Sequence, residues 1–286
     1  MKVLLGIDED GQYRSAMALL ERLRFPETEL TLLHVNQSQS YPVSLPSLPV
    51  FSGTEEPIEE PSRSAQIQRI ATEEAEACGF DSNEIYETGS PSDRLLLYSF
   101  QLPADLVAIG SCSRAAAPRL TGSVAHALIA DSTKSFLVSH GNVAPAGRLR
   151  CLFATDHSMY ANRALNRFLD WAPAGIAEMT IFTAIEPRAS HSESGGRING
   201  ISVDPQVIAT RSSRIAENLE NQGIRSHVRF GAGRPAEAIL KAASELRVDL
   251  LILGARGHGF LDRIFLGSVS SAVIDRANFP VLVMRP

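Results

Sequence analysis

The feature that most constrains this 286-residue chain is an internal repeat. Residues 105–110 read DLVAIG and residues 249–254 read DLLILG. A Gly-Ser-Val segment begins twelve residues after the end of the first of these and thirteen residues after the end of the second. Matched segments keep their order and spacing over roughly 140 residues, which indicates two copies of one structural unit. We assign the two units to residues 1–142 and 148–286.

Each unit alternates short apolar runs with amphipathic segments, which predicts an α/β fold. In the second unit we expect strands at about 150–155, 179–185, 226–231, 249–254 and 280–284, and helices at about 159–172, 205–222, 235–247 and 268–277. Continuous apolar strands alternating with helices predict a parallel sheet covered on both faces. A ligand crevice is then expected at the carboxyl ends of the strands. The segments 36–63 and 186–204 are rich in Pro, Ser, Gly and Glu, so we expect surface loops there.

The composition excludes several classes of protein. Hydrophobic residues make up 44% and charged residues 21% of the chain, close to the averages of soluble globular proteins. No apolar run approaches the roughly 18–20 residues that cross a bilayer, so we expect no membrane association. The net charge of −5 argues against nucleic-acid binding. Three cysteines without paired spacing are typical of a reducing compartment, so we expect a cytoplasmic protein.

Charge is divided unevenly between the two units. Residues 1–144 carry 10 basic and 19 acidic side chains, a net charge of −9. Residues 145–286 carry 17 basic and 13 acidic side chains, a net charge of +4. An anionic ligand is therefore favoured by the second unit.

The strongest chemical motif is a glycine-rich loop in the second unit. Gly254 ends a buried strand, where a ligand needs to approach the backbone closely. Gly257 allows a positive φ as the chain turns away, and nine residues later Gly267 and Ser268 open the next helix. Free N–H groups at a helix start attract anions. The simpler interpretation is a tight loop with an ordinary serine cap, but the complete pattern favours phosphate binding.

This Gly-x-x-Gly-x9-Gly-Ser pattern after the fourth strand resembles the ATP-binding motif of the universal stress protein family. The resemblance covers nearly the whole chain as two tandem Rossmann-like (HUP-type) domains that bind adenine nucleotides. It implies five parallel strands per domain, with helices on both faces and a nucleotide over the strand ends. It also implies that the domains pair through their last strands, residues 135–139 with 280–284, as an intramolecular pseudo-dimer.

The resemblance assigns nucleotide contacts to specific residues of the second unit. Asp156 matches the acidic residue at the adenosine end, and Ile185 matches the hydrophobic position against the adenine. Gly254 would lie by the ribose, and Arg256 could reach the phosphates, as could Arg263. The residues expected around the phosphates are Gly257, Gly267, Ser268, Val269 and Ser270. Ser158 keeps the Asp-x-Ser pattern of the family, although it could simply cap the helix that begins near Tyr160.

The first unit departs from the family pattern. Ser113 stands where the second glycine belongs, and the loop before the Gly-Ser pair is one residue short. A degenerate unit that is retained as a structural partner explains this departure, with weaker nucleotide binding as the alternative. The residues that survive from the pattern, and that would form the weaker site, are Asp8, Val35, Gly110, Gly122 and Ser123.

The function expected from the sequence is that of a stress-response regulator that binds ATP or a related nucleotide, with or without Mg²⁺. The alternative is an interaction scaffold of the same fold that binds no nucleotide. An efficient ATPase is not indicated, because His258 and Asp262 have no partners in sequence that would orient a nucleophile. The histidines show no metal-ligand spacing. We expect an adenine nucleotide and a protein as partners, and the sequence leaves further homodimerisation open.

Overall fold

The computed structural model describes residues 1–37, 63–111, 123–141, 147–187, 196–198, 201–256 and 266–285. The elements of the first half are β1 (Lys2–Ile7), α1 (Tyr13–Leu23), β2 (Glu29–Asn36), α2 (Arg63–Ala77), β3 (Asp81–Thr88), α3 (Pro91–Gln101), β4 (Leu106–Ser111), α4 (Ser123–Asp131) and β5 (Ser135–His140). The elements of the second half are β6 (Leu149–Ala154), α5 (Met159–Asp170), β7 (Ile176–Pro187), β8 (Gly196–Ile198), β9 (Ile201–Val203), α6 (Pro205–Asn221), β10 (Arg225–Ala232), α7 (Pro235–Glu245), β11 (Leu250–Gly254), α8 (Ser268–Arg276) and β12 (Val281–Met284).

Each half contains a five-stranded parallel sheet, as the repeat predicted. The strand order is β3-β2-β1-β4-β5 in the first half and β10-β7-β6-β11-β12 in the second. The strands bury side chains on both faces because helices cover both: Leu4 packs on one side of β1 and Leu5 on the other. The helices α1, α2, α5 and α6 share one hydrophobic core, and α3, α4, α7 and α8 share the other.

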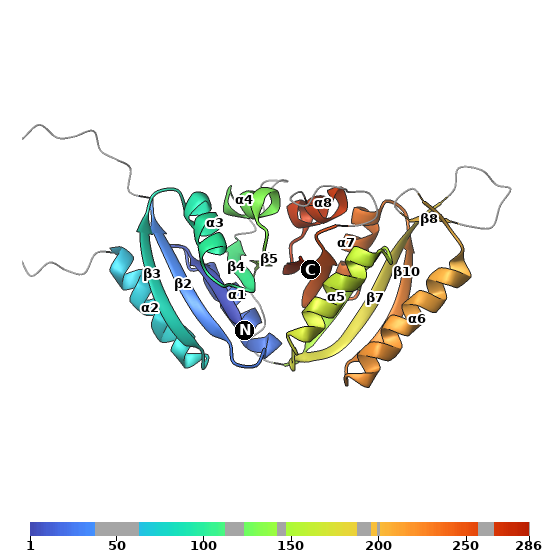
Figure 1. Cartoon of the computed structure of the whole chain (residues 1–286), viewed down its shortest axis with the longest axis horizontal. Helices are drawn as coiled ribbons and strands as arrows, with labels where there is room; N and C mark the ends of the chain where they lie inside the picture. The colour runs from blue at the N-terminus through green and yellow to red at the C-terminus, as the bar shows by residue number, and fades with distance from the viewer. Residues whose placement is uncertain are drawn as a thin grey trace, which may run out of the picture.

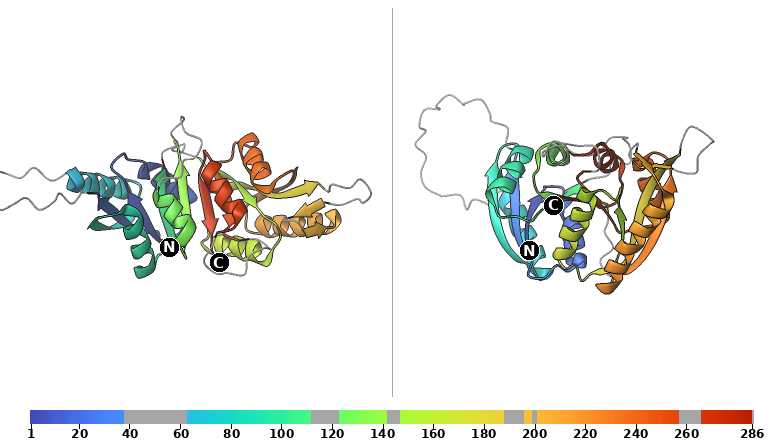
Figure 2. Two further views of the ribbon diagram at one scale, coloured as in Figure 1. Left: turned by 90° about the horizontal axis from the view of Figure 1, so that it is seen from above. Right: turned by 45° about the vertical axis from the view of Figure 1, so that its right-hand side comes forward.

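The two halves join through their last strands into one continuous sheet. β5 runs antiparallel to β12, with Phe136 opposite Val283 and Val138 opposite Val281. This pairing confirms the intramolecular pseudo-dimer expected between residues 135–139 and 280–284. Above the junction α4 and α8 lie side by side (Figures 1 and 2), and His126 Nε2 lies 3.9 Å from Asp275 Oδ1.

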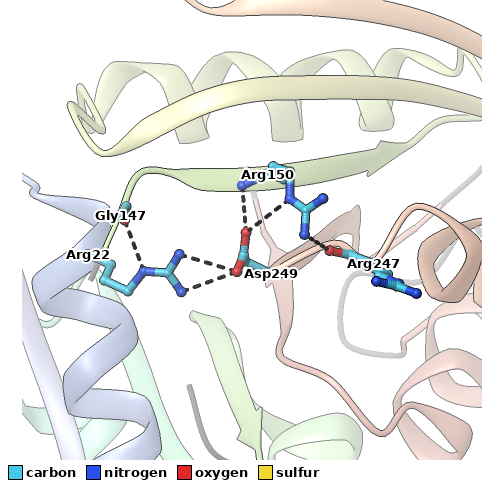
Figure 3. Close-up of polar contacts among 5 residues, drawn as sticks. All are labelled: Arg22, Gly147, Arg150, Arg247 and Asp249. Carbon is cyan, nitrogen blue, oxygen red and sulfur yellow. Dashed lines mark hydrogen bonds and ion pairs between the residues drawn. The ribbon is translucent and has the colours of Figure 1, made fainter. Parts of the chain in front are cut away.

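The first helix of each half packs at the boundary between the halves. Phe25, which follows α1, meets Trp171 after α5 edge to face, with ring centroids 5.7 Å apart. The Arg22 side chain crosses the boundary, donating to the carbonyl of Gly147 at 3.1 Å and lying 3.2 Å from Asp249 Oδ1 (Figure 3). Apolar and ionic contacts therefore both hold the halves together.

One of the two expected surface loops contains regular structure. Within 186–204, β8 pairs antiparallel with the end of β7, with Glu186 opposite Arg197, and β9 returns beside β8. The expectation of a plain loop was wrong there, because runs of three residues are too short to show strand periodicity. The other expected loop was 36–63, and residues 38–62 of it lie outside the described residues. Among the described helices, none combines the length and apolar character that crossing a bilayer requires.

Candidate nucleotide site

A cavity of about 540 Å³ opens at the carboxyl ends of β6, β7 and β11 in the second half. This is the edge where the topology of a parallel sheet predicts ligand binding. Three segments that the sequence separates meet here: the turn after β6, the end of β7, and the start of α8. The cavity is lined by Ala154, Thr155, Asp156, Ala161, Phe182, Ala184, Glu186, Ile198, Arg234, Pro235, Ala236, Ile239, Leu253, Gly254, Arg256, Gly267, Ser268, Val269 and Ser270.

The start of α8 forms one wall of the cavity. Gly267 is the N-cap residue, and within the described part of the chain no side chain caps the first turn. Ser268 is exposed, whereas Ser270 is buried and donates its hydroxyl proton to the Gly254 carbonyl at 2.8 Å. The backbone amides of α8 and the positive end of its dipole therefore face the cavity without a competing carboxylate or hydroxyl cap. Gly257 lies outside the described residues.

Gly254, which ends β11, lines the cavity, but the packing around it also requires a glycine. A Cβ on Gly254 would lie 3.3 Å from the Arg256 carbonyl and 3.4 Å from the Ala164 Cβ. A methyl group here would press on both the loop and α5. Close helix packing therefore contributes to the requirement for glycine at this position.

Two arginines supply positive charge to the cavity. Arg256 follows β11, and Arg234 is the N-cap residue of α7, with Pro235 as the first helical residue. The charge of Arg256 also acts on a third arginine, Arg285, which is not part of the lining: burial, with a smaller contribution from Arg256, lowers the pKa of Arg285 to about 10. Sequence reasoning included Arg256 but missed Arg234, which was visible only as the middle residue of the Gly-Arg-Pro segment that opens α7.

Two carboxylates also line the cavity. Asp156 follows β6, and its Oδ1 accepts the backbone N–H of Ser158 at 2.9 Å. Ser158 is the N-cap residue of α5, and its hydroxyl oxygen accepts the Ala161 N–H at 3.1 Å, which confirms the capping interpretation of this serine. Glu186 at the end of β7 also lines the cavity and was not anticipated from the sequence.

Ile185 does not line the cavity, in contrast to its two neighbours on β7. The alternation of the strand turns Ala184 and Glu186 toward the cavity, together with Phe182, and turns Ile185 away. The carbonyl of Ile185 instead accepts the Gly233 N–H at 3.1 Å. The Ile185 side chain, which was expected against an adenine ring, is therefore not part of this lining, and its assignment to the nucleoside stays a prediction.

Sequence reasoning missed two further residues, of which one lines the cavity and the other lies behind its wall. Ile198 of β8 is only 3% exposed and covers the end of the cavity near β7. His157 has a φ of +57° and is buried behind the Asp156 turn. Its Nε2 lies 2.9 Å from the Thr183 hydroxyl and 3.2 Å from the Ser212 hydroxyl, so it ties this turn to β7 and α6.

The first half has a cavity of about 470 Å³ at the corresponding strand ends. Asp8, Val35 and Gly110 line it, as does Val124 near the start of α4, whereas Gly122 lies outside the described residues. Ser123 is the first residue of α4. The described lining contains the carboxylates of Asp8, Glu9 and Asp10 but no lysine or arginine.

The turn after β1 also encroaches on the first cavity. Both carboxylate oxygens of Asp8 are engaged by the start of α1, accepting the N–H groups of Gln12 at 3.0 Å and Tyr13 at 2.8 Å. The backbone of this longer turn lies directly on β4, because a Cβ on Gly110 would fall 1.9 Å from the Gln12 carbonyl oxygen. The corresponding Gly254 has no neighbour so close.

Fold and cavities together define a class: a pseudo-symmetric pair of Rossmann-like α/β domains with a crevice at the strand ends of each. The universal stress protein family matches residues 1–140 and again residues 148–285. The chain therefore belongs to the universal stress protein family and is a tandem two-domain member of it.

Individual relatives agree with this assignment. A universal stress protein of Thermus aquaticus is 51% identical over 139 residues, which cover 47% of this chain and 96% of that protein. One from Mycolicibacterium smegmatis is 26% identical over 301 residues, covering 99% of this chain and 97% of that protein. The crystal structure of a universal stress protein from Archaeoglobus fulgidus superposes with a TM-score of 0.67 at 21% identity, covering 100% of this chain and 98% of the other, and shares the fold.

Proposed function

We propose that the second half of this universal stress protein binds ATP or a related nucleotide, and that the bound nucleotide regulates a stress-response interaction. The observation that carries the proposal is the start of α8, which has no side-chain cap and opens onto a cavity that also holds Arg234 and Arg256. Backbone amides, a helix dipole and two guanidinium groups suit a polyphosphate. The cavity volume lies within the range of about 300–1,000 Å³ that is usual for small-molecule sites.

The charges within the cavity favour one orientation of the bound nucleotide. The phosphates belong beside Gly267, Ser268, Val269 and Ser270, next to Arg256, whose Cα would lie 3.8 Å from a Cβ on Gly267. The nucleoside belongs beside Asp156 and Glu186, because carboxylates accept hydrogen bonds from ribose hydroxyls or an exocyclic amino group and repel phosphate. Phe182 and Ala184 supply the apolar surface in place of Ile185. Mg²⁺ enters only as a companion of the phosphates, since the described residues contain no cluster of three side chains suited to hold a metal.

We propose that the first half binds no nucleotide. Its cavity presents three carboxylates to a ligand that would carry several negative charges. The Asp8 carboxylate that would meet the nucleoside is engaged at both oxygens by α1. The stoichiometry expected is therefore one nucleotide per chain.

The test combines nucleotide release with titration. The purified full chain is denatured and the released nucleotide is quantified by mass spectrometry; nucleotide-free protein is then titrated with ATP by calorimetry. About one ATP per chain supports the proposal. No released nucleotide and no heat of binding would favour the scaffold without a nucleotide, and release of phosphate during the titration would indicate an enzyme.

Gly267→Val is the variant that tests where the phosphates bind. Gly267 has φ −65° and ψ 150°, which a β-branched residue adopts freely, and its added Cβ would lie 3.4 Å from the Ala255 carbonyl. The fold should therefore persist, while the valine methyl groups occupy the space of the phosphates. Normal ATP binding by this variant would place the phosphates elsewhere. The same pair of proteins, with and without ATP, can then be used to isolate partners that depend on the nucleotide.

The proposal includes a cytoplasmic location. Cys78 and Cys151 are free thiols, and burial raises the pKa of the Cys151 thiol, which makes it unreactive. Free cysteines are typical of a reducing compartment. Fractionation of cells followed by immunodetection tests this part independently.

A further inference from the structure

The two outer strands of the sheet carry charges of opposite sign. β3 contains three carboxylates and neither lysine nor arginine, whereas β10 contains two arginines and a histidine and no carboxylate. Asp81 and Glu84 on β3 are exposed, as are Arg225 and Arg229 on β10. The two strands lie on opposite sides of the molecule (Figure 1). The molecule thus has an acidic edge, formed by Asp81 and Glu84, and a basic edge, formed by Arg225 and Arg229.

Both edges remain open to strand addition within the described part of the chain. Among the described strands, β3 pairs with β2 alone and β10 with β7 alone. Each strand has eight residues, contains no proline and pairs in register without a bulge. Neither strand has the proline, lysine or bulge that often prevents sheet edges from associating; the exposed charges that they do carry oppose pairing of like edges but not of unlike edges. Exposed aromatic side chains add apolar surface to each edge: Tyr86 is 50% and Phe230 is 45% exposed.

The charged side chains at these edges are available for contacts outside the chain. Among the described residues, Asp81, Arg225 and Arg229 form no ion pair. Glu84 accepts the Thr72 hydroxyl, which leaves its negative charge uncompensated. Other charged groups on the two strands already have partners within the chain: Glu87 lies 3.7 Å from Arg94, and His227 lies 3.8 Å from Glu178.

We propose that a second copy of this chain is the partner of these edges, with β3 of one molecule pairing with β10 of the next. β3 is parallel to β5, β10 is parallel to β12, and β5 and β12 are antiparallel, so the added strand is antiparallel. Stacking by translation also keeps α1, α2, α5 and α6 of successive copies on the same face. The sheet continues from one molecule to the next.

Charge selects this arrangement over the symmetric alternatives. A two-fold contact of β3 with β3 would bring carboxylates together, and β10 with β10 would bring arginines together, which is unfavourable in both cases. The antiparallel β3–β10 contact instead brings the acidic edge of one copy to the basic edge of the next, with Glu84 opposite Arg229 when the two strands pair over their whole length. Such a head-to-tail contact uses two different surfaces, so it generates an open series of oligomers and not a closed dimer.

The test is sedimentation velocity of the full chain over a range of concentrations at low and high salt. At roughly 20 mM salt we expect a ladder of species that grows with concentration, and at roughly 500 mM salt a monomer, because exposed charge pairs are screened. Two charge reversals separate the edges: Asp81→Lys with Glu84→Lys, and Arg225→Glu with Arg229→Glu. Each variant alone should be monomeric at low salt, and an equimolar mixture of the two should associate again. Lys241→Glu, on the exposed face of α7, is the control and should behave as the unmodified chain.

Recovery in the mixture is the result that a merely misfolded variant cannot give, and circular dichroism of each variant verifies its fold. A chain that stays monomeric at low salt at every concentration would overturn the proposal. So would a ladder that survives either charge reversal, since this would locate the contact on another surface.

Discussion

Arg22 of α1 and Asp249, which immediately precedes β11, form an ion pair of 3.2 Å across the boundary between the two halves. The repeat produces the reciprocal contact: Arg167, in the last turn of α5, lies 3.2 Å from Asp105, which precedes β4. The two pairs are equivalent in topology but differ in environment. The Arg22 side chain is 6% exposed and that of Arg167 is 45% exposed.

This difference in burial sets the first prediction. Arg22→Ala should lower the free energy of unfolding by about 2 kcal/mol, because it leaves a partly buried Asp249 carboxylate whose remaining side-chain contacts among the described residues are those with Arg150. Arg167→Ala should cost less than about 1 kcal/mol, because an exposed pair is well solvated. Guanidinium unfolding of the three proteins measures both values. Equal losses would mean that burial does not determine the strength of these two contacts.

The second prediction concerns the backbone contact beside this pair. Gly175 donates its N–H to the Leu23 carbonyl at 3.0 Å, and a Cβ on Gly175 would fall 1.7 Å from the carbonyl oxygen of Arg22. Since neither backbone can move without separating α1 from the second half, Gly175→Ala should cost about 3 kcal/mol. Gly223→Ala is the control, with φ +77° and no atom near its Cβ. It should cost about 1 kcal/mol from backbone strain alone. Unfolding midpoints that fall equally would contradict the proposed steric contact.

The repeat and the apolar periodicity predicted most of the fold. The expected helix at about 159–172 corresponds to α5 and the expected strand at about 226–231 to β10. The β5–β12 junction followed from the resemblance, which the family match and the strand pairing confirm. The β8–β9 hairpin did not follow, because pairing with β7 creates it and three-residue strands leave no pattern.

The lining of the candidate site was predicted less completely. The lining residues of the glycine motif, such as Gly254 and Gly267, could be identified from the sequence, because few residue types allow a ligand to approach the backbone closely. Ile185 is not among the lining residues, whereas its neighbours Ala184 and Glu186 are, because the sequence of a strand end does not fix which residues of an alternating pair point inward. Arg234 and Glu186 were missed because their roles depend on helix and strand ends that meet only in the folded chain.

The third prediction separates phosphate binding from nucleoside binding. Arg234→Ala and Arg256→Ala should each weaken ATP binding about tenfold and leave adenosine binding unchanged, because a charged hydrogen bond to phosphate is worth more than about 1 kcal/mol. Neither arginine caps a helix through its side chain in the described structure, so stability should change little. Calorimetric titration with both ligands measures the effect, with Lys241→Ala on α7 as a charge-matched control. A parallel loss of adenosine affinity would show that the arginines do not act through phosphate.

The last prediction concerns pH and rests on His140, the final residue of β5. Its side chain is 4% exposed, and neither ring nitrogen has a hydrogen-bond partner among the described residues. Burial lowers the pKa of this imidazole from 6.5 to about 4. Between these two values the unfolded chain binds a proton that the folded chain does not, so the folded state loses stability as pH falls. The folded state has its full stability above pH 6.5, and about 3 kcal/mol of the free energy of unfolding should be lost as the pH falls from 6.5 to 4.

His140→Leu removes the titrating group while keeping the site apolar. The difference in unfolding free energy between the unmodified chain and this variant should therefore change by about 3 kcal/mol between pH 7 and pH 4, with the variant becoming relatively more stable in acid. Whatever offset the added leucine introduces at neutral pH cancels in that difference. Parallel profiles for His140→Leu and the unmodified chain would mean that water or a neighbouring group solvates the imidazole, and that its burial does not govern acid stability.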